Sequence, residues 1–349
     1  MSIRVLVVDD SAFMRKLISE IINAEPDMEV AATARNGKDA LIKLSQLDID
    51  VVTLDVEMPV MDGLETLRQI MSSNPLPVVM LSSMTKHGSD TTVKALALGA
   101  VDFVPKPSGS ISLDLKTVSQ EIVEKVRTAA KAKVRKTRRT WIPPRSIHPK
   151  PPVLKPTAGK ASSRVVIIGS STGGPKAIEE VLAHIPPNLP AGIMVVQHMP
   201  KDFTRSFAER LNSLFPLSIK EAEHGDMIED GKVLIAPGDY HMTVGADRCV
   251  YLNQEERVMF LRPSIDVTML SLPTVFGTRI LGVVLTGMGR DGAKGMAAIK
   301  QAGGKTIAQD RSTSTIYSMP RVVAEEGNAD YILPVDRIGE SITKIVSTM

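Results

Sequence analysis

The stretch Arg164-Val-Val-Ile-Ile-Gly-Ser-Ser-Thr-Gly-Gly-Pro175 decides how the second half of this chain folds. Its four consecutive apolar residues, Val165 to Ile168, are typical of a strand that is buried on both faces of a sheet. The small residues that follow predict a sharp turn, and Pro175 suits the first turn of a helix. The stretch therefore predicts a strand, a tight turn and a helix, with Ser171 presented on the turn.

Two functions fit this turn. A serine among small residues after a buried strand matches the G-x-S-x-G pattern, in which the turn lifts a nucleophilic hydroxyl clear of the sheet. A glycine-rich turn at the start of a helix also binds phosphate in dinucleotide folds. Both functions need the same strand, turn and helix, so the stretch alone leaves them open.

Length and composition indicate two globular domains. The chain has 349 residues, of which 43% are apolar and 23% charged, enough for two separate cores. Its one cysteine, Cys249, cannot form an internal disulfide, which fits a reducing compartment. The first ten residues are unlike a signal peptide, and no apolar run reaches membrane-spanning length. We therefore expect a cytoplasmic protein that does not insert into a membrane.

Charge is distributed unevenly along the chain. Residues 126–160 contain eleven Lys or Arg residues, no Asp or Glu, and six prolines, whereas the net charge of the whole chain is only +3. Proline at this density excludes helices and the interior of sheets. We predict domains at residues 1–125 and 161–349, joined by a basic, proline-rich linker at 126–160. Contact with nucleic-acid phosphates is the alternative use of this segment, and the prolines favour the linker.

The first domain alternates apolar runs with helical patterns. This alternation predicts a doubly wound α/β domain with a sheet of parallel strands. Ligands of such sheets bind at the carboxyl ends of the strands. The expected strands are residues 5–8, 29–33, 51–54, 78–81 and 100–104.

Five polar residues follow the ends of these strands: Asp9 and Asp10 after the first, Asp55 after the third, Ser82 after the fourth and Lys106 after the fifth. Three carboxylates at one edge repel one another unless a hard cation lies between them, and Mg²⁺ prefers oxygen ligands. We therefore predict a metal site that holds a phosphoryl group for attack by one carboxylate, with the serine and the lysine on the phosphoryl oxygens. A helix N-cap is the alternative for the first two acids, and it leaves the other three residues unexplained.

The motifs of this domain resemble those of response-regulator receiver domains, which have a flavodoxin-like fold. The matching stretches are Val7-Val-Asp-Asp10, Thr53-Leu-Asp-Val-Glu-Met-Pro-Val-Met-Asp-Gly63, Met80-Leu-Ser-Ser83 and Val104-Pro-Lys-Pro107. The resemblance implies that Asp55 is the phosphoacceptor, that Asp9 and Asp10 hold Mg²⁺, and that Phe103 is the aromatic switch residue. It also implies a histidine kinase as phosphodonor.

The second domain repeats the alternation of strands and helices. It predicts another doubly wound parallel sheet, Rossmann-like, with an antiparallel excursion at residues 240–252. The expected strands are 165–168, 192–197, 232–236, 280–285 and 305–308, and the expected helices include 203–214, 266–276 and 291–301.

Two polar residues follow strand ends near Ser171. His198 ends the apolar run at 193–196, and Asp291 lies in a glycine-rich loop after the run at 280–285. His241, in a turn-rich segment, is the only serious rival among the six histidines. Taken alone, Asp291 is better explained as a helix N-cap, but with Ser171 and His198 it completes a Ser-His-Asp triad.

A triad needs each of these side chains. Ser171 would attack, His198 would take its proton, and Asp291 would fix the tautomer of the imidazole. The backbone N–H groups of Thr172 and Met288 would bind the developing oxyanion. The chain order Ser, His, Asp differs from the Ser, Asp, His order of α/β-hydrolases, which argues for a separate hydrolase family.

The motifs of the second domain resemble the catalytic domain of the CheB family, the chemotaxis protein-glutamate methylesterases. They are Gly169-Ser-Ser-Thr-Gly-Gly174, Val196-Gln-His-Met-Pro200, Ala236-Pro-Gly-Asp-Tyr-His-Met242, Arg262-Pro-Ser-Ile-Asp266 and Leu285-Thr-Gly-Met-Gly-Arg-Asp291. The resemblance implies hydrolysis of glutamate methyl esters on methyl-accepting chemoreceptors, and often deamidation of receptor glutamines, without a cofactor for the esterase reaction. With a receiver domain in front, it also implies control by phosphorylation.

Two other classes of function remain as alternatives. A response regulator whose output binds DNA would use the basic segment, but no helix-turn-helix pattern follows Gly159. A nucleotide-binding oxidoreductase would use the turn at 169–174, but this turn lacks the G-x-G-x-x-G spacing and an acidic ribose partner. We therefore expect a phosphorylation-controlled esterase that does not bind nucleic acid.

Overall fold

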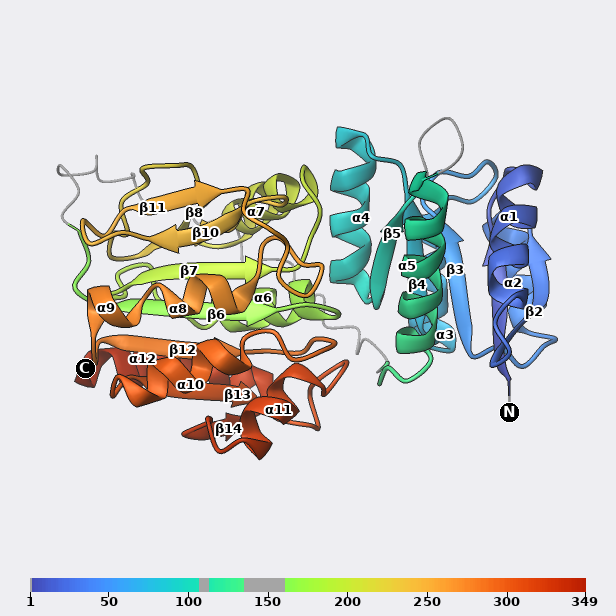
Figure 1. Ribbon diagram of the computed structural model, residues 1–349. Coiled ribbons are helices and arrows are strands. Elements are labelled where there is room, and N and C mark those ends of the chain that lie inside the picture. Colours follow the sequence, from blue (N-terminus) through green and yellow to red (C-terminus); the bar gives the residue numbers. More distant parts are fainter. Residues whose placement is uncertain (1, 107–112, 135–160) are drawn as a thin grey trace. The chain divides into compact units, whose positions relative to one another are not determined.

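The computed structural model describes residues 2–106, 113–134 and 161–349. It divides into two compact units, Met1–Trp141 and Ile142–Met349. Each unit has its own parallel sheet flanked by helices (Figure 1). The predicted fold class, two doubly wound α/β domains, is confirmed.

The first unit has a five-stranded parallel sheet in the order β2-β1-β3-β4-β5. The two central strands, β3 and β4, are completely buried, as their apolar sequences predict. The last strand begins two residues later than predicted because Gly99, with a φ of 117°, ends the preceding helix in the left-handed conformation. The strands are β1 (Ile3–Val8), β2 (Met28–Ala34), β3 (Val51–Asp55), β4 (Val78–Ser82) and β5 (Asp102–Pro105), and the helices are α1 (Ala12–Asn23), α2 (Gly37–Leu44), α3 (Gly63–Ser73), α4 (Lys86–Leu98) and α5 (Leu113–Ala129).

The predicted linker begins inside helix α5. Val126 and Ala129 are buried in the core of the first unit, so the first residues of the segment 126–160 belong to this helix. Residues 135–160, with the prolines and Trp141, lie outside the described residues, and the boundaries of the linker stay a prediction. Among the residues that the structure describes, none of the helices has the length and apolar character needed to cross a bilayer.

The second unit has a seven-stranded sheet in the order β14-β13-β12-β6-β7-β9-β8, in which every pairing is parallel. The predicted antiparallel excursion is the hairpin of β10 and β11. Two edge strands, β8 and β14, were not predicted, because they are short and partly exposed and so lack an apolar run. The strands are β6 (Val165–Ser170), β7 (Gly192–Gln197), β8 (Ser218–Glu221), β9 (Lys232–Ile235), β10 (His241–Val244), β11 (Val250–Asn253), β12 (Ile280–Val284), β13 (Lys305–Gln309) and β14 (Tyr331–Leu333).

The helices of this unit follow the predicted pattern with two differences. The helix expected at 266–276 is two short helices, because Pro273 cannot continue the first. The helix expected from Asp291 begins at Ala293, after Gly292 in the left-handed conformation at a φ of 94°. The helices are α6 (Gly174–Leu182), α7 (Phe203–Leu214), α8 (Ile265–Leu270), α9 (Pro273–Phe276), α10 (Ala293–Gln301), α11 (Met319–Glu325) and α12 (Val335–Thr348).

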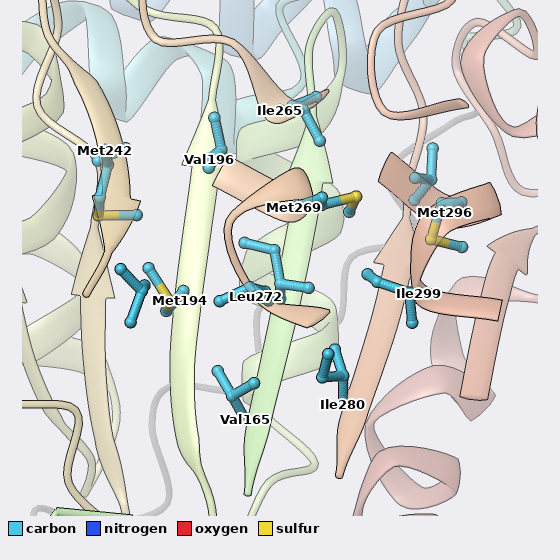
Figure 2. Close-up of a cluster of buried hydrophobic side chains, with 14 of the residues drawn as sticks. Val165, Met194, Val196, Met242, Ile265, Met269, Leu272, Ile280, Met296 and Ile299 are labelled. Carbon is cyan, nitrogen blue, oxygen red and sulfur yellow. The ribbon is translucent and has the colours of Figure 1, made fainter. Parts of the chain in front are cut away.

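Helix α8 packs directly on the centre of the sheet. Figure 2 shows Ile265 and Met269 of this helix among buried side chains of the strands, Val165 and Met194 among them. The approach is so close that a Cβ added at Gly169 of β6 would lie 2.5 Å from Ile265 Cγ2. The packing fixes the N-terminus of α8 over the sheet, where it contacts the candidate site.

Candidate active site

Ser171 directly follows β6, at the carboxyl edge of the sheet. Its N–H donates to the carbonyl of Thr286 (3.1 Å), which follows β12, and its carbonyl accepts from Gly174 N–H (2.7 Å) to close the turn into α6. The left-handed residue of this turn is Gly173, with a φ of 76°, and not the serine. The predicted turn is therefore present, and its positive φ lies two residues after the candidate nucleophile.

Gln197, the last residue of β7, ties the serine strand to the histidine strand. Its side chain is buried, accepts from Ser170 Oγ (2.7 Å), and donates to the carbonyls of Ser171 (3.0 Å) and His198 (3.1 Å). A Cβ at Gly174 would lie 2.1 Å from Gln197 Oε1, so the glycine makes room for this amide. Sequence analysis missed Gln197, although a polar residue that ends an apolar run is a usable signal.

His198 and Asp291 meet at the same edge. Imidazole Nε2 and carboxylate Oδ2 are 2.9 Å apart, and both side chains are nearly inaccessible to solvent. Burial alone would raise the pKa of Asp291, but the hydrogen bond from His198 and the N–H groups of Ile265 and Asp266 outweigh it and lower that pKa. The carboxylate is therefore ionised and holds the Nε2 proton, which leaves Nδ1 as the basic nitrogen of the ring.

Ser171 and His198 are neighbours by strand register. Ser170 pairs with Gln197 in the parallel ladder of β6 and β7, so each candidate residue comes one position later. Backbone connects them further, because His198 N–H donates to Ser170 O (3.1 Å). Among the described contacts there is no hydrogen bond between Ser171 Oγ and the imidazole; without substrate such catalytic hydrogen bonds are often long.

Asp291 also organises the N-terminus of α8. Its carboxylate accepts hydrogen bonds from Ser264 Oγ (3.0 Å), Ile265 N–H (2.7 Å) and Asp266 N–H (3.0 Å). The N-cap residue of α10 is Gly292, so the explanation of Asp291 as the cap of the helix that follows it is wrong. The carboxylate instead binds the first turn of a helix that lies earlier in the chain, and this fixes its orientation toward the histidine.

Asp266 makes the reverse connection. It lies in the first turn of α8, is buried, and accepts a hydrogen bond from Gly295 N–H (2.8 Å) of α10. Burial and the charge of Asp291 raise the pKa of Asp266. The helices also approach closely, because a Cβ at Gly295 would lie 2.3 Å from Met269 Cβ. Asp291, just before α10, thus binds N-terminal amides of α8, and Asp266, in the first turn of α8, binds an N-terminal amide of α10. We call this arrangement the reciprocal caps.

The loop between β12 and α10 lies against Ser171. A Cβ at Gly287 would be 2.9 Å from Ser171 Cβ and 2.3 Å from Met319 Sδ, so the loop backbone touches the candidate nucleophile. Thr286 Oγ1 donates to the carbonyl of Thr172 (3.0 Å). The two predicted oxyanion donors, the N–H groups of Thr172 and Met288, therefore belong to segments that are held together beside the serine.

His241 is not part of this site. It is buried, Nε2 lies 3.0 Å from the carbonyl of Glu256, and Nδ1 lies 3.3 Å from the N–H of Ser264. Both ring nitrogens have backbone partners, so the side chain supports two loops. The strand-end histidine, His198, is the one beside the serine.

The first unit brings together its predicted acidic residues. One oxygen from each of Asp9, Asp10 and Asp55 lies within 4.8 Å of the others, and Lys106 Nζ is 2.8 Å from both Asp9 Oδ2 and Asp55 Oδ2. Burial raises the pKa of Asp55 to about 6 although Lys106 opposes the rise, and the charge of Asp9 adds to it. The three carboxylates fit a hard divalent cation such as Mg²⁺.

Ser82 and Phe103 are buried at the carboxyl half of the same sheet. Ser82 Oγ accepts from Thr92 Oγ1 (2.6 Å) and donates to the carbonyl of Gly88 (3.2 Å), both on α4. Lys125 Nζ lies 5.0 Å from the centroid of the Phe103 ring. The Ser82 hydroxyl is thus hydrogen-bonded to residues of α4. The backbone N–H of Lys106, whose side chain contacts the acids, donates to the Ser82 carbonyl (2.7 Å).

Comparison with known proteins decides the family. The CheB methylesterase family model matches residues 166–342, and the response regulator receiver domain model matches residues 5–116. A protein-glutamate methylesterase/protein-glutamine glutaminase of Symbiobacterium thermophilum is 51% identical over 99% of this chain and 97% of its own length. The chain belongs to the CheB methylesterase family. It is a CheB-type methylesterase with a receiver domain.

Other CheB-family proteins agree with this assignment. A relative of the same name from Pyrococcus abyssi is 47% identical over 99% of this chain and 94% of its own length. The crystal structure of the Thermotoga maritima CheB methylesterase catalytic domain is 42% identical, with a TM-score of 0.52, and covers 52% of this chain and 98% of that one. Neither matched family model describes DNA binding, so the DNA-binding alternative is not favoured.

Proposed function

We propose that the second unit hydrolyses γ-methyl esters of glutamate side chains in methyl-accepting chemoreceptors, releases methanol, and does so in the cytoplasm under control of the receiver unit. The observation that carries the proposal is the buried hydrogen bond between His198 and Asp291. His198 follows β7, the strand that pairs with the strand before Ser171. The names of the relatives support a methylated glutamate as the substrate group, and the resemblance to the chemotaxis methylesterases supports the chemoreceptors as its carriers.

The proposed chemistry is acyl transfer to the serine. Nδ1 of His198 removes the proton of Ser171 Oγ as this oxygen attacks the ester carbonyl carbon, and the imidazolium is stabilised by Asp291. The tetrahedral intermediate expels the methoxy group, which takes the proton from His198 and leaves as methanol. Water then attacks the acyl-enzyme with the same base, and the products are a glutamate carboxylate and the free serine.

Oxyanion stabilisation is proposed for the backbone. The N–H of Thr172 follows the nucleophile at the turn into α6, and the N–H of Met288 follows Gly287, whose backbone lies against Ser171. Two such donors, fixed before the reaction, stabilise negative charge on the carbonyl oxygen without reorganisation. No cofactor is needed for these steps.

A glutamine side chain would undergo the same reaction with ammonia as leaving group. Attack by Ser171 on the amide carbon gives the same acyl-enzyme, and His198 supplies the proton that the departing nitrogen needs. The glutaminase part of the relatives' name supports this second activity.

In the receiver unit, Asp55 is the proposed phosphoacceptor and a chemotaxis histidine kinase the phosphodonor. Asp9, Asp10 and Asp55 would hold Mg²⁺, which neutralises charge on the phosphoryl oxygens when bound. Lys106 already contacts two of the acids and would contact the phosphoryl group. The Ser82 hydroxyl would break its hydrogen bonds to α4 and bind a phosphoryl oxygen instead, and the side chain of Phe103 would respond as the switch residue.

Methanol release from methylated receptors tests both halves of the proposal. With a small phosphodonor and Mg²⁺, the wild-type rate should rise, and Asp55→Asn should stay at the unstimulated rate. Ser171→Ala should lose activity by several orders of magnitude with its fold intact. Near-normal methanol release by Ser171→Ala would exclude the mechanism, and equal stimulation of Asp55→Asn would exclude phosphorylation at that residue.

Residues 161–349 alone provide the test of restraint. If the unphosphorylated receiver restrains the esterase, this fragment should release methanol faster than the unphosphorylated full chain. Equal or slower release by a folded fragment would contradict the restraint.

A further inference from the structure

A two-residue turn in the second unit presents the most exposed large apolar side chain among the described residues. Val258 and Leu261 pair as an antiparallel bridge, with N···O distances of 3.1 and 2.9 Å, and Met259 and Phe260 form the tip between them. The side chain of Phe260 is 92% exposed and that of Met259 is 46% exposed. We call these two residues the apolar tip.

The backbone of the apolar tip is strained. Met259 and Phe260 have φ values of 50° and 64°, the left-handed region in which turns of this length normally carry Asn and Gly. A single exposed apolar residue needs no explanation. Two adjacent large apolar residues with positive φ values do need an explanation, because backbone outliers of this kind concentrate at functional sites.

Hydrogen bonds anchor the segment behind the apolar tip. The guanidinium of Arg262 donates to the carbonyls of Gln254 (2.8 Å) and Glu255 (2.9 Å) and to Asp239 Oδ1 (2.7 Å). His241 holds the carbonyl of Glu256, so a fourth contact anchors the loop. The ring is therefore presented by an anchored loop, so little further ordering of the loop backbone is needed on binding.

The anchors of the apolar tip lead to the candidate active site. Ser264, four residues after Phe260, donates to Asp291, the carboxylate that orients His198. The loop that carries Asp239 packs on the turn after His198, because a Cβ at Gly238 would lie 2.3 Å from Lys201 N. The tip therefore belongs to the same edge of the unit as the serine, on the side of β7 and β9.

We propose that the apolar tip docks the protein that bears the methyl ester, by inserting Phe260 among apolar side chains of that protein beside the modified glutamate. The proposal rests on the proposed function. An ester carried on a protein side chain offers few atoms to Ser171 and its neighbours, so recognition needs contacts outside the reacting group. An aromatic side chain on an anchored loop at the same edge of the unit supplies such a contact, because an aromatic ring buries a large area with few rotatable bonds.

Steady-state kinetics of the full chain, with phosphodonor and Mg²⁺, test this role with two substrates: methylated receptor and a small glutamate γ-methyl ester. Phe260→Ala should raise KM for the receptor about ten-fold, as truncation of a central aromatic contact does, and should leave kcat unchanged. Its kinetics on the small ester should equal those of the wild type. Phe260→Leu should recover part of the affinity because it restores apolar area.

The matched control is Ile332→Ala. Ile332 is 51% exposed on β14, at the opposite edge of the sheet from β8 and β9. This variant should match the wild type on both substrates. A lowered receptor affinity in Ile332→Ala equal to that in Phe260→Ala would show a general effect of surface truncation and overturn the docking role.

Other outcomes identify other occupants of the apolar tip. Unchanged receptor KM in Phe260→Ala, or an equal loss on the small ester, overturns the docking role. Faster methanol release by unphosphorylated Phe260→Ala would assign the tip to the receiver unit, and loss of a dimer in sedimentation would assign it to a second copy. A wild-type chain that releases no methanol from the receptor overturns the proposed function as well, whereas an active wild type with an unaffected variant overturns the docking role alone.

Discussion

Replacement of Asp55 by Asn should stabilise the first unit at neutral pH. The folded state raises the pKa of this buried carboxyl from 3.8 to about 6. At pH 7.5 the carboxylate is ionised in both the folded and the unfolded state, and the raised pKa corresponds to about 3 kcal/mol that ionisation costs the folded state. Asn removes the charge at nearly constant volume, so this free energy is recovered.

The sign of the pH dependence follows from the direction of the pKa change. The folded state binds the Asp55 proton more tightly than the unfolded state does. The stability that the protonated Asp55 contributes is therefore fully present below pH 3.8 and is lost as the pH rises through about 6. The advantage of Asp55→Asn should therefore be largest above pH 6 and should shrink toward pH 4. Mg²⁺ should stabilise the wild type and have little effect on the variant, because it offsets the same repulsion.

Amide hydrogen exchange of the full chain measures the change in the free energy of unfolding of the first unit. With a chelator at pH 7.5, the slowest amides of β3 and β4 should exchange about 150-fold more slowly in Asp55→Asn than in the wild type, the factor that about 3 kcal/mol gives. Asp48→Asn, which changes an exposed carboxyl of the same unit, is the control and should exchange as the wild type does. Equal exchange in the wild type and Asp55→Asn at pH 7.5, or faster exchange in the variant, would refute the reasoning.

Three further substitutions probe the two sites. Asp291→Asn should lower kcat for methanol release by about 10³ to 10⁴, because an amide cannot accept hydrogen bonds on both of its terminal atoms; a loss below ten-fold would contradict this. Gly287→Ala should lower kcat about 100-fold with little change in far-UV circular dichroism, since the new methyl displaces Ser171, and normal turnover would show that the loop adjusts. Thr92→Val should raise methanol release without phosphodonor about five-fold, because the Ser82 hydroxyl loses one hydrogen bond that holds it in the unphosphorylated position. Thr92→Ser should restore the low rate. An unchanged rate in Thr92→Val would show that this hydrogen bond does not restrain the switch.

The fold was predictable wherever long apolar runs exist. Val165 to Ile168 predicted the central strand β6 and the turn after it, and Pro273 was a readable break in the helix expected at 266–276. The strands β8 and β14 were missed because edge strands need little apolar sequence, and their position depends on pairing with β9 and β13. Local sequence does not contain that pairing.

The candidate sites were predictable to the extent that their residues follow strand ends. Ser171, His198 and Asp291 come after three apolar runs, and the structure places those runs on the adjacent strands β6, β7 and β12. Gln197 and Asp266 were missed in their supporting roles, because a buried amide and a buried carboxylate resemble ordinary strand-end and helix-start residues. Their partners are distant in sequence, and only the folded chain shows them. The catalytic role of the triad stays a prediction.

The strand order of the second unit also determines when a growing chain can acquire this site. Ile280 of β12 pairs with Val165 of β6, so the strand that precedes Asp291 inserts beside a strand made much earlier. The N-terminal amides of α8 likewise lack their carboxylate partner until Asp291 has been synthesised, and the Asp266 side chain lacks its partner until Gly295 follows. A ribosome-bound chain that ends before residue 280 has the serine and the histidine but lacks Asp291 and the strand β12 that pairs with β6. The proposed triad is therefore complete only late in synthesis, after β12 and the loop that bears Asp291 have been made.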